Sequence, residues 1–168
     1  MAELTPAERL QPCLLDRLTD DRPEEVKESR DQRIVSLRRY RRAVLRDLDW
    51  LLNTGARAST EDFAEFAEVA RSVLNYGIPD LCGSTASGLK PEEFERQLVE
   101  AVRAFEPRIL PHTVAVEVRA AYGQMDHNAI TFEIRGELWA RPVPESLYIR
   151  TEVDLETGQC ELKDRPHG

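Results

Sequence analysis

The strongest hydrophobic pattern in the chain recurs at three- and four-residue spacing, which is typical of an amphipathic α-helix. Its apolar positions are Ile34, Leu37, Val44, Leu48 and Leu51, with Tyr40 and Trp50 on the flanks. Ser29 and Gln32 have the spacing of a capping box at its start, and Gly55 follows its end. The pattern predicts a helix from about Arg30 to Asn53.

Two further helical patterns follow along the chain. The first runs from Ser59 to Tyr76, with apolar positions Phe63, Phe66, Ala67, Ala70, Val73 and Leu74. The second begins near Pro91, whose fixed backbone angle suits a first helical turn. It ends at Phe105 and is expected to bury Phe94, Leu98, Ala101, Val102 and Phe105. Each pattern predicts an amphipathic helix.

From Thr113 the pattern changes to strict alternation, which predicts β-strands. The alternating apolar sets are Val114, Val116, Val118 and Ala120, then Ile130, Phe132 and Ile134. A third strand is expected over Leu147–Leu155, and a turn at 156–158 leads into a fourth through Cys160 and Leu162. Helices followed by a meander predict an α+β fold, in which the helices pack on a small, mainly antiparallel sheet of three to four strands.

Prolines set the N-terminal residues apart from this pattern, because they interrupt any helix there. We therefore expect an arm over residues 1–28, a single α+β domain over residues 29–163, and a tail over residues 164–168. Within the arm, Leu14, Leu15 and Leu18 form one turn of an amphipathic helix. A stripe this short is not stable alone, so it either folds back on its own domain or lies in a partner's groove.

The composition narrows the possible functions. A chain of 168 residues is ordinarily one domain, and its net charge of −8 argues against nonspecific nucleic-acid binding. Seven arginines between positions 30 and 46 nevertheless form a local basic face. Such a face is usually only solvated, and the alternative is a small regulatory adaptor that binds an acidic or nucleic-acid partner.

The cysteines and histidines predict no metal site or cofactor. Cys13, Cys82 and Cys160 are widely spaced, which indicates reduced thiols. No apolar run approaches the roughly 20 residues that a membrane-spanning helix needs. Because the first residues lack the pattern of a secretory signal, we expect the protein to remain in the cytoplasm.

The tripeptide Glu106-Pro107-Arg108 stands where the helical pattern gives way to the strand pattern. Proline cannot continue a helix and restricts the residue before it, so the two charged residues belong to a stiff corner. Such a corner is either an internal latch or a key that docks on another protein.

Six short segments can be compared with known families: Leu14 to Leu18, Val44 to Leu48, Trp50 to Thr54, Ser72 to Leu81, Phe105 to Leu110 and Val143 to Glu145. These segments, in their order along nearly the whole chain, resemble those of the baseplate wedge family of contractile phage tails. More narrowly, the chain resembles the type VI secretion baseplate subunits called TssE.

The resemblance implies a non-catalytic baseplate subunit that helps to start sheath polymerisation. Its implied partners are TssF- and TssG-like wedge subunits with the associated TssK, and TssB- and TssC-like sheath subunits. Glu106, Pro107 and Arg108 correspond to the family's wedge-docking motif. The implied location is a baseplate docked at the bacterial inner membrane complex.

An exposed edge strand would suit sheath initiation, because its unpaired backbone groups can be continued by another chain. Two strands are candidates for this edge. One contains Tyr148, Arg150 and Glu152, and the other is its hairpin mate at 159–162.

Glycoside hydrolysis is the enzymatic alternative, because proteins of this resemblance have been labelled lysozyme-like. That reaction needs a protonated acid and a second carboxylate. Glu106 is the only candidate acid, and pairing with Arg108 would lower its pKa, which is the wrong direction for a proton donor. The sequence also lacks a Gly-x-Ser-x-Gly elbow and a phosphate-binding loop. We therefore expect no enzymatic activity.

Overall fold

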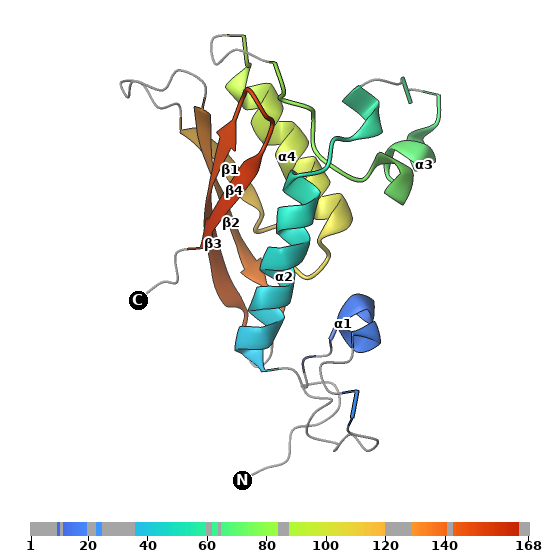
Figure 1. Cartoon of the computed structure of the whole chain (residues 1–168), viewed down its shortest axis with the longest axis vertical. Coiled ribbons are helices and arrows are strands. Elements are labelled where there is room, and N and C mark those ends of the chain that lie inside the picture. The colour runs from blue at the N-terminus through green and yellow to red at the C-terminus, as the bar shows by residue number, and fades with distance from the viewer. Residues whose placement is uncertain are drawn as a thin grey trace.

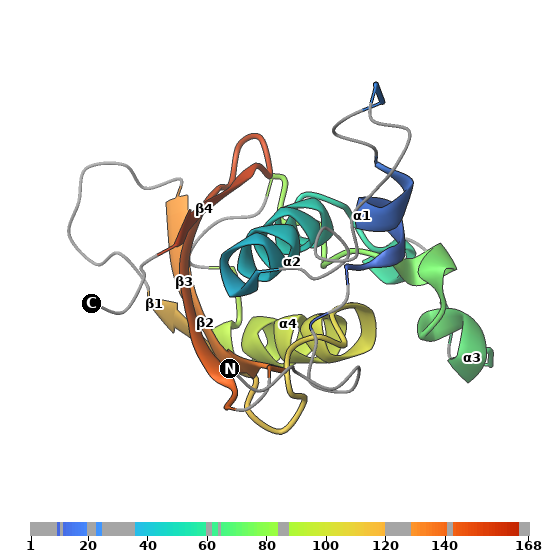
Figure 2. The same cartoon turned by 90° about the horizontal axis from the view of Figure 1, so that it is seen from below.

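The computed structural model describes residues 10, 12–19, 23–24, 36–59, 62–63, 65–83, 88–119, 129–140 and 143–164. Helices α2 (Leu37–Leu52) and α4 (Pro91–Phe105) lie against one face of an antiparallel sheet, as Figures 1 and 2 show. The strands are β1 (Ala115–Arg119), β2 (Ala129–Leu138), β3 (Glu145–Asp154) and β4 (Cys160–Asp164). The predicted α+β fold is confirmed.

Within the described residues, the sheet has four strands in the order β1-β2-β3-β4, so each strand pairs with its neighbour in the chain. In this register Phe132 stands opposite Val118 on one side and Thr151 on the other. Alternate residues point to the helices and form the core. Its fully buried side chains include Leu48, Leu51, Leu98, Phe132, Ile134 and Ile149.

The start of α2 differs from the prediction. Ser36 has an extended backbone, and its hydroxyl accepts a hydrogen bond from the Arg39 amide at 3.3 Å, so Ser36 is the N-cap. The predicted start near Arg30 is therefore wrong. The expected capping residues Ser29 and Gln32 lie outside the described residues.

The continuous helix expected over residues 59–76 is also wrong. The chain instead forms the short turns η3 (Arg57–Ser59), α3 (Ala67–Ala70) and η4 (Val73–Asn75). Ser72 causes one of the interruptions, because its extended backbone ends the preceding turn and its hydroxyl accepts from the Leu74 amide at 3.2 Å. Of the predicted apolar positions, Phe66, Val73 and Leu74 are exposed.

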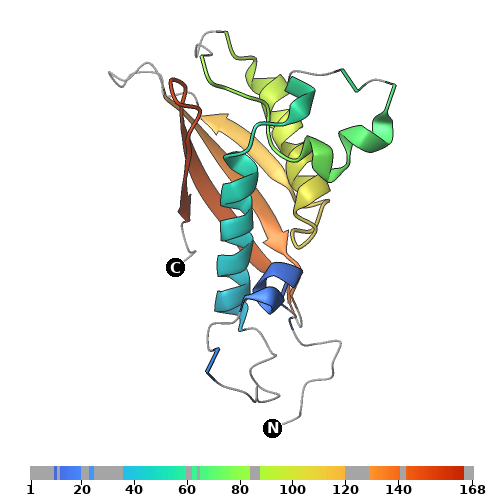
Figure 3. The ribbon, with the colours of Figure 1, turned by 45° about the vertical axis from the view of Figure 1, so that its right-hand side comes forward.

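We call the described residues within 55–78, which leave out 60, 61 and 64, the lobe. Its two ends are joined by the Ala56 amide donating to the Ile78 carbonyl at 2.8 Å and the Ile78 amide donating to the Thr54 carbonyl at 2.9 Å. Gly77 makes this closure possible, because its φ is +136° and a Cβ there would lie 2.3 Å from the Thr54 carbonyl oxygen. Figure 3 shows α3 standing away from α2, α4 and the sheet.

The arm contributes a short helix, α1 (Leu14–Leu18), at the predicted leucine turn. The prediction for α4 is also confirmed, although Phe105 is only half-buried and packs edge-on against the Tyr76 ring at 5.2 Å. The turn expected near residues 122–128 lies outside the described residues, and the domain limits at 28 and 163 stay predictions.

Candidate docking site

The corner at the end of α4 is closed by an ion pair within its own tripeptide. The Glu106 amide still bonds to the Val102 carbonyl at 2.9 Å, and the Glu106 residue is only 2% exposed. The Arg108 guanidinium donates from Nε to Oε1 at 2.6 Å and from Nη2 to Oε2. The Arg108 amide adds a third hydrogen bond to Oε1 at 3.1 Å. The carboxylate of Glu106 is thus fully engaged inside the fold.

Arg108 also ties this corner to α2. Its Nη2 donates to Asp47 Oδ2 at 2.6 Å, and the Tyr76 hydroxyl donates to the Asp47 carbonyl at 3.4 Å. Burial alone would lower the pKa of Arg108, but the hydrogen bonds and charges of Glu106 and Asp47 outweigh it and raise that pKa above its ordinary value. The guanidinium therefore remains charged.

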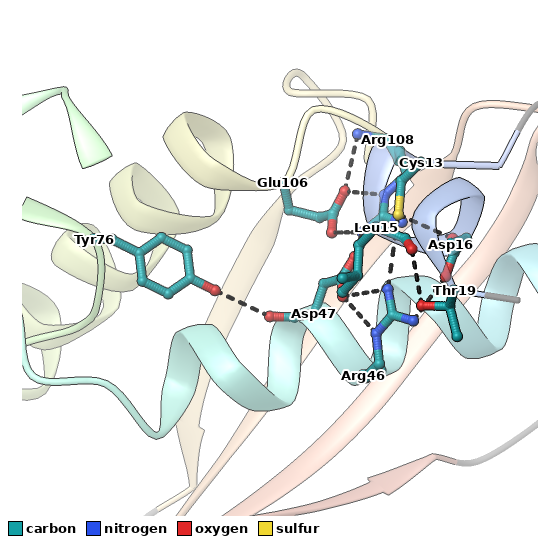
Figure 4. A network of polar contacts seen from close by, with 9 residues as sticks. All are labelled: Cys13, Leu15, Asp16, Thr19, Arg46, Asp47, Tyr76, Glu106 and Arg108. Carbon is teal, nitrogen blue, oxygen red and sulfur yellow. Dashed lines mark hydrogen bonds and ion pairs between the residues drawn. The ribbon is translucent and has the colours of Figure 1, made fainter. Parts of the chain in front are cut away.

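The same ion network continues to the arm, as Figure 4 shows. Arg46 contacts Asp47 Oδ1 at 2.7 Å through Nη2 and Asp16 Oδ1 at 2.7 Å through Nη1. The Cys13 thiol donates to Asp16 Oδ2 at 2.9 Å. Burial would raise the pKa of Asp16, but the hydrogen bonds from Cys13 and Arg46 lower it below its ordinary value. Charges of alternating sign thus run from α1 across α2 to the corner.

Helix α1 has its polar side toward the domain and its leucines toward solvent. Leu14 is 71% exposed, Leu18 is 74% exposed and Leu15 is 39% exposed, while the side chain of Asp16 is 14% exposed. This is the reverse of an amphipathic helix that packs on its own core. Helix α1 is therefore held by the ion pair of Asp16 with Arg46 and presents an apolar stripe outward.

The geometry brings Glu106 and Arg108 together with Asp47, a residue that the sequence pattern did not single out. Asp47 lies on the polar side of α2, where spacing alone gives no sign of a partner 61 residues away. Pro107 is exposed, whereas Arg108 Nη1 is buried and has no hydrogen-bond partner in the structure. The ion pairs of Arg108 thus join the end of α4 to α2.

The strand order shows which of the two candidate strands lies at the edge of the described sheet. Strand β3, with Tyr148, Arg150 and Glu152, lies between β2 and β4, so β4 is the outermost strand on that side of the described sheet. The three side chains point outward from the sheet: Arg135 lies 5.6 Å over the Tyr148 ring, and Lys163 pairs with Glu152 at 3.0 Å. They form part of a charged outer face rather than a backbone edge.

The start of β4 is shielded by Asn53, the residue after α2. Its Nδ2 donates to the Cys160 carbonyl at 3.0 Å, and its Oδ1 accepts from the Cys160 amide at 2.9 Å. The Asn53 side chain therefore occupies the outward backbone groups of Cys160 as a neighbouring strand would. Because backbone groups alternate in direction along an antiparallel strand, the next outward pair belongs to Leu162.

Two arginines of the basic face expected on the first helix make contacts inside the fold. Arg41 donates to Glu145 at 3.1 Å and to the Ser146 carbonyl at 3.0 Å, and Arg46 belongs to the ion network. Arg38, Arg39 and Arg42 are exposed, and Arg30 and Arg33 lie outside the described residues. Part of the predicted basic face is therefore accessible to a partner.

The arrangement offers little to support hydrolysis. A cavity of about 340 Å³ lies between residues 79–81 and the start of α4, and Glu106 does not line it. Among the described residues, no group of His, Cys, Asp and Glu could hold a metal ion. No helix in the described ranges is long and apolar enough to cross a membrane.

A comparison of the chain with models of protein families identifies its family. The family described as "Baseplate wedge protein gp25" matches residues 38–143, a span that contains α2 from its second residue, the lobe, α4, the corner, β1 and β2. Searches of curated proteins and of solved structures found no match. The family is structural and forms part of the baseplate of phage-like contractile tails. Since the match covers well over half of the sequence, the chain belongs to the gp25 family of baseplate wedge proteins.

Proposed function

We propose that this protein is a TssE-like structural subunit of a type VI secretion baseplate, which joins the wedge subunits and helps to start the sheath. The observation that carries the proposal is the family match over residues 38–143, which includes both α2 and the corner. The ion network supports it, because a rigid charged scaffold suits a part that must hold several partners in fixed orientation.

Wedge docking is assigned to the helical side of the molecule. Leu14 and Leu18 enter an apolar groove of a TssF- or TssG-like subunit, and Leu15 lies beside them at the rim. The latch formed by Glu106 and Arg108 fixes the surface on which the partner rests, and Pro107 is its exposed point. TssK joins through these wedge subunits.

Sheath initiation is assigned to the opposite side, at β4. A strand from a TssB- or TssC-like subunit adds to the outward backbone groups of Leu162, and Asn53 sets the register by blocking Cys160. Glu152 and Lys163 keep this region soluble before the partner arrives, since charged side chains discourage unplanned edge pairing.

The proposed location is the cytoplasmic face of the inner membrane complex, without membrane insertion or nucleic-acid binding. We propose no catalysis, because Glu106 is held by Arg108 and is separated from the described cavity. Purified protein should leave a peptidoglycan suspension turbid. Clearing that disappears in Glu106→Gln would support the hydrolase alternative.

The proposal is tested by pulling the tagged chain from native cells and identifying the proteins that accompany it by mass spectrometry. TssF- and TssG-like subunits are expected, and Leu14→Ser with Leu18→Ser should reduce their recovery. Val143→Ser is the matched control, because Val143 is 70% exposed but lies outside α1. Absence of baseplate subunits, together with salt-sensitive retention on DNA, would favour the adaptor alternative.

A further inference from the structure

The lobe contains α3, which stands away from α2, α4 and the sheet in Figure 3. Three of its large apolar side chains face solvent: Phe66 is 59% exposed, Val73 is 80% exposed and Leu74 is 59% exposed. A single exposed apolar residue needs no explanation, but a group on one small projection marks an interaction surface. Neither the ion network nor the sheet edge uses these residues.

The lobe is held in a definite shape despite its small size. The Asn75 side chain donates to the Ala70 carbonyl at 2.9 Å and accepts from the Ala58 amide at 2.8 Å, which ties η4 to both α3 and η3. The Ser72 hydroxyl donates to the Val69 carbonyl at 2.9 Å. A partner would therefore meet a preorganised surface and lose less conformational entropy on binding.

The charges around these side chains indicate what the partner must offer. Glu65 and Glu68 are exposed on either side of Phe66 and form no ion pair within the described ranges. Arg71 is the only basic residue between positions 65 and 75, so acidic groups are in excess there. The complementary surface is an apolar groove with lysine or arginine at its rim.

We propose that the lobe is a docking element that inserts Phe66, Val73 and Leu74 into a basic-rimmed apolar groove on another kind of baseplate subunit. This inference rests on the proposed baseplate role but concerns a different surface from α1 and the corner. A second copy of the chain is a poorer occupant, because each copy has a net charge of −8 and like charges repel.

The experiment uses a double variant that carries both Phe66→Ser and Val73→Ser. It is compared with the unmodified chain and with the Val143→Ser control. The three substituted positions, Phe66, Val73 and Val143, are largely exposed, so melting temperatures should stay close to that of the unmodified chain. In pull-downs from native cells, recovery of one baseplate subunit should fall at least about tenfold in the double variant, because buried aromatic and aliphatic anchors dominate interfaces. Glu65→Lys with Glu68→Lys should weaken the same subunit's recovery.

A photo-crosslinking residue at position 73 identifies the contact directly. A crosslink to that same baseplate subunit, in a segment that contains lysine or arginine, is the expected result. Crosslinking only to a second copy, or undiminished recovery of every baseplate subunit by the single Val73→Ser and double variants, would overturn the inference. If the unmodified chain recovers no baseplate subunit at all, it is the proposed function that fails.

Discussion

Replacing Arg108 by alanine gives the most direct test of the latch. The change removes the guanidinium that engages both oxygens of Glu106 and contacts Asp47 at 2.6 Å. In this variant Glu106 stays buried, at 2% exposure. Of its three hydrogen bonds from residue 108, only the one from the backbone amide persists. A buried carboxylate would then lack its counter-charge.

The size of the effect follows from this burial. Removing one partner of a buried ion pair typically destabilises a protein by about 3–5 kcal/mol. The Arg108 side chain is 17% exposed and the backbone donor to Glu106 persists, so the lower end applies. We expect Arg108→Ala to lower the free energy of unfolding by about 3 kcal/mol. This exceeds the roughly 0.5 kcal/mol typical of a surface position, which is what a key that merely projects into solvent would give.

The measurement is urea unfolding followed by the fluorescence of Trp50 and Trp139. Arg42→Ala is the matched control, because Arg42 is an exposed arginine on α2, and it should change stability by no more than about 0.5 kcal/mol. Replacing Glu106 and Arg108 together by leucine should destabilise less than Arg108→Ala, since no buried charge is then left alone. A loss below about 1 kcal/mol for Arg108→Ala would refute the latch.

Three further outcomes are expected. The pKa of Asp16 is lowered, so its contact with Arg46 should be intact at neutral pH and be lost only as the pH falls below the ordinary range of an aspartate. Amide exchange of residues 14–18 should show this pH dependence, and Asp16→Asn should abolish it. Burial, and to a lesser extent the charge of Asp49, raises the pKa of the Cys160 thiol to about 12. Iodoacetamide at a pH of about 8 should therefore modify the exposed Cys82 and spare Cys160 until urea unfolds the chain. Equal modification rates of the two thiols in the folded chain would contradict the burial of Cys160. Leu162→Pro removes the outward amide of β4 and should give baseplates without sheaths, whereas normal sheaths formed by a folded variant would exclude this edge.

The sequence predicted α4 and the meander well because their patterns are local. Alternation at Ile130, Phe132 and Ile134 places them on one face whatever the neighbouring strand is, and the structure buries all three. The same reasoning gave a wrong prediction for the lobe, where the expected helix is replaced by short turns. Phe66 and Val73 have helical spacing, but the hydroxyl of Ser72 and the amide of Asn75 satisfy backbone groups in a way that favours short turns over a helix.

The site could be predicted only in part for a related reason. Glu106 and Arg108 are two residues apart in the sequence, so their pairing could be expected, whereas Asp47 and Asp16 join the network through packing between distant elements. The same limit applies to Asn53, whose position suggested a helix end and whose side chain instead covers the backbone of Cys160.

The two proposed docking sides share one structural support. α2 carries Asp47 and Arg46, which hold the corner and the arm, and it ends at Asn53, which sets the accessible part of β4. Its buried side holds the core through Leu48 and Leu51. In the proposed function, a helix that lies between the two docking sides would fix the orientation of one partner relative to the other. Orientation of this kind would need no catalytic group. It agrees with a fold in which Arg46, Asp47 and Arg108 are paired internally, while α1 and the lobe expose Leu14, Leu18, Phe66 and Val73.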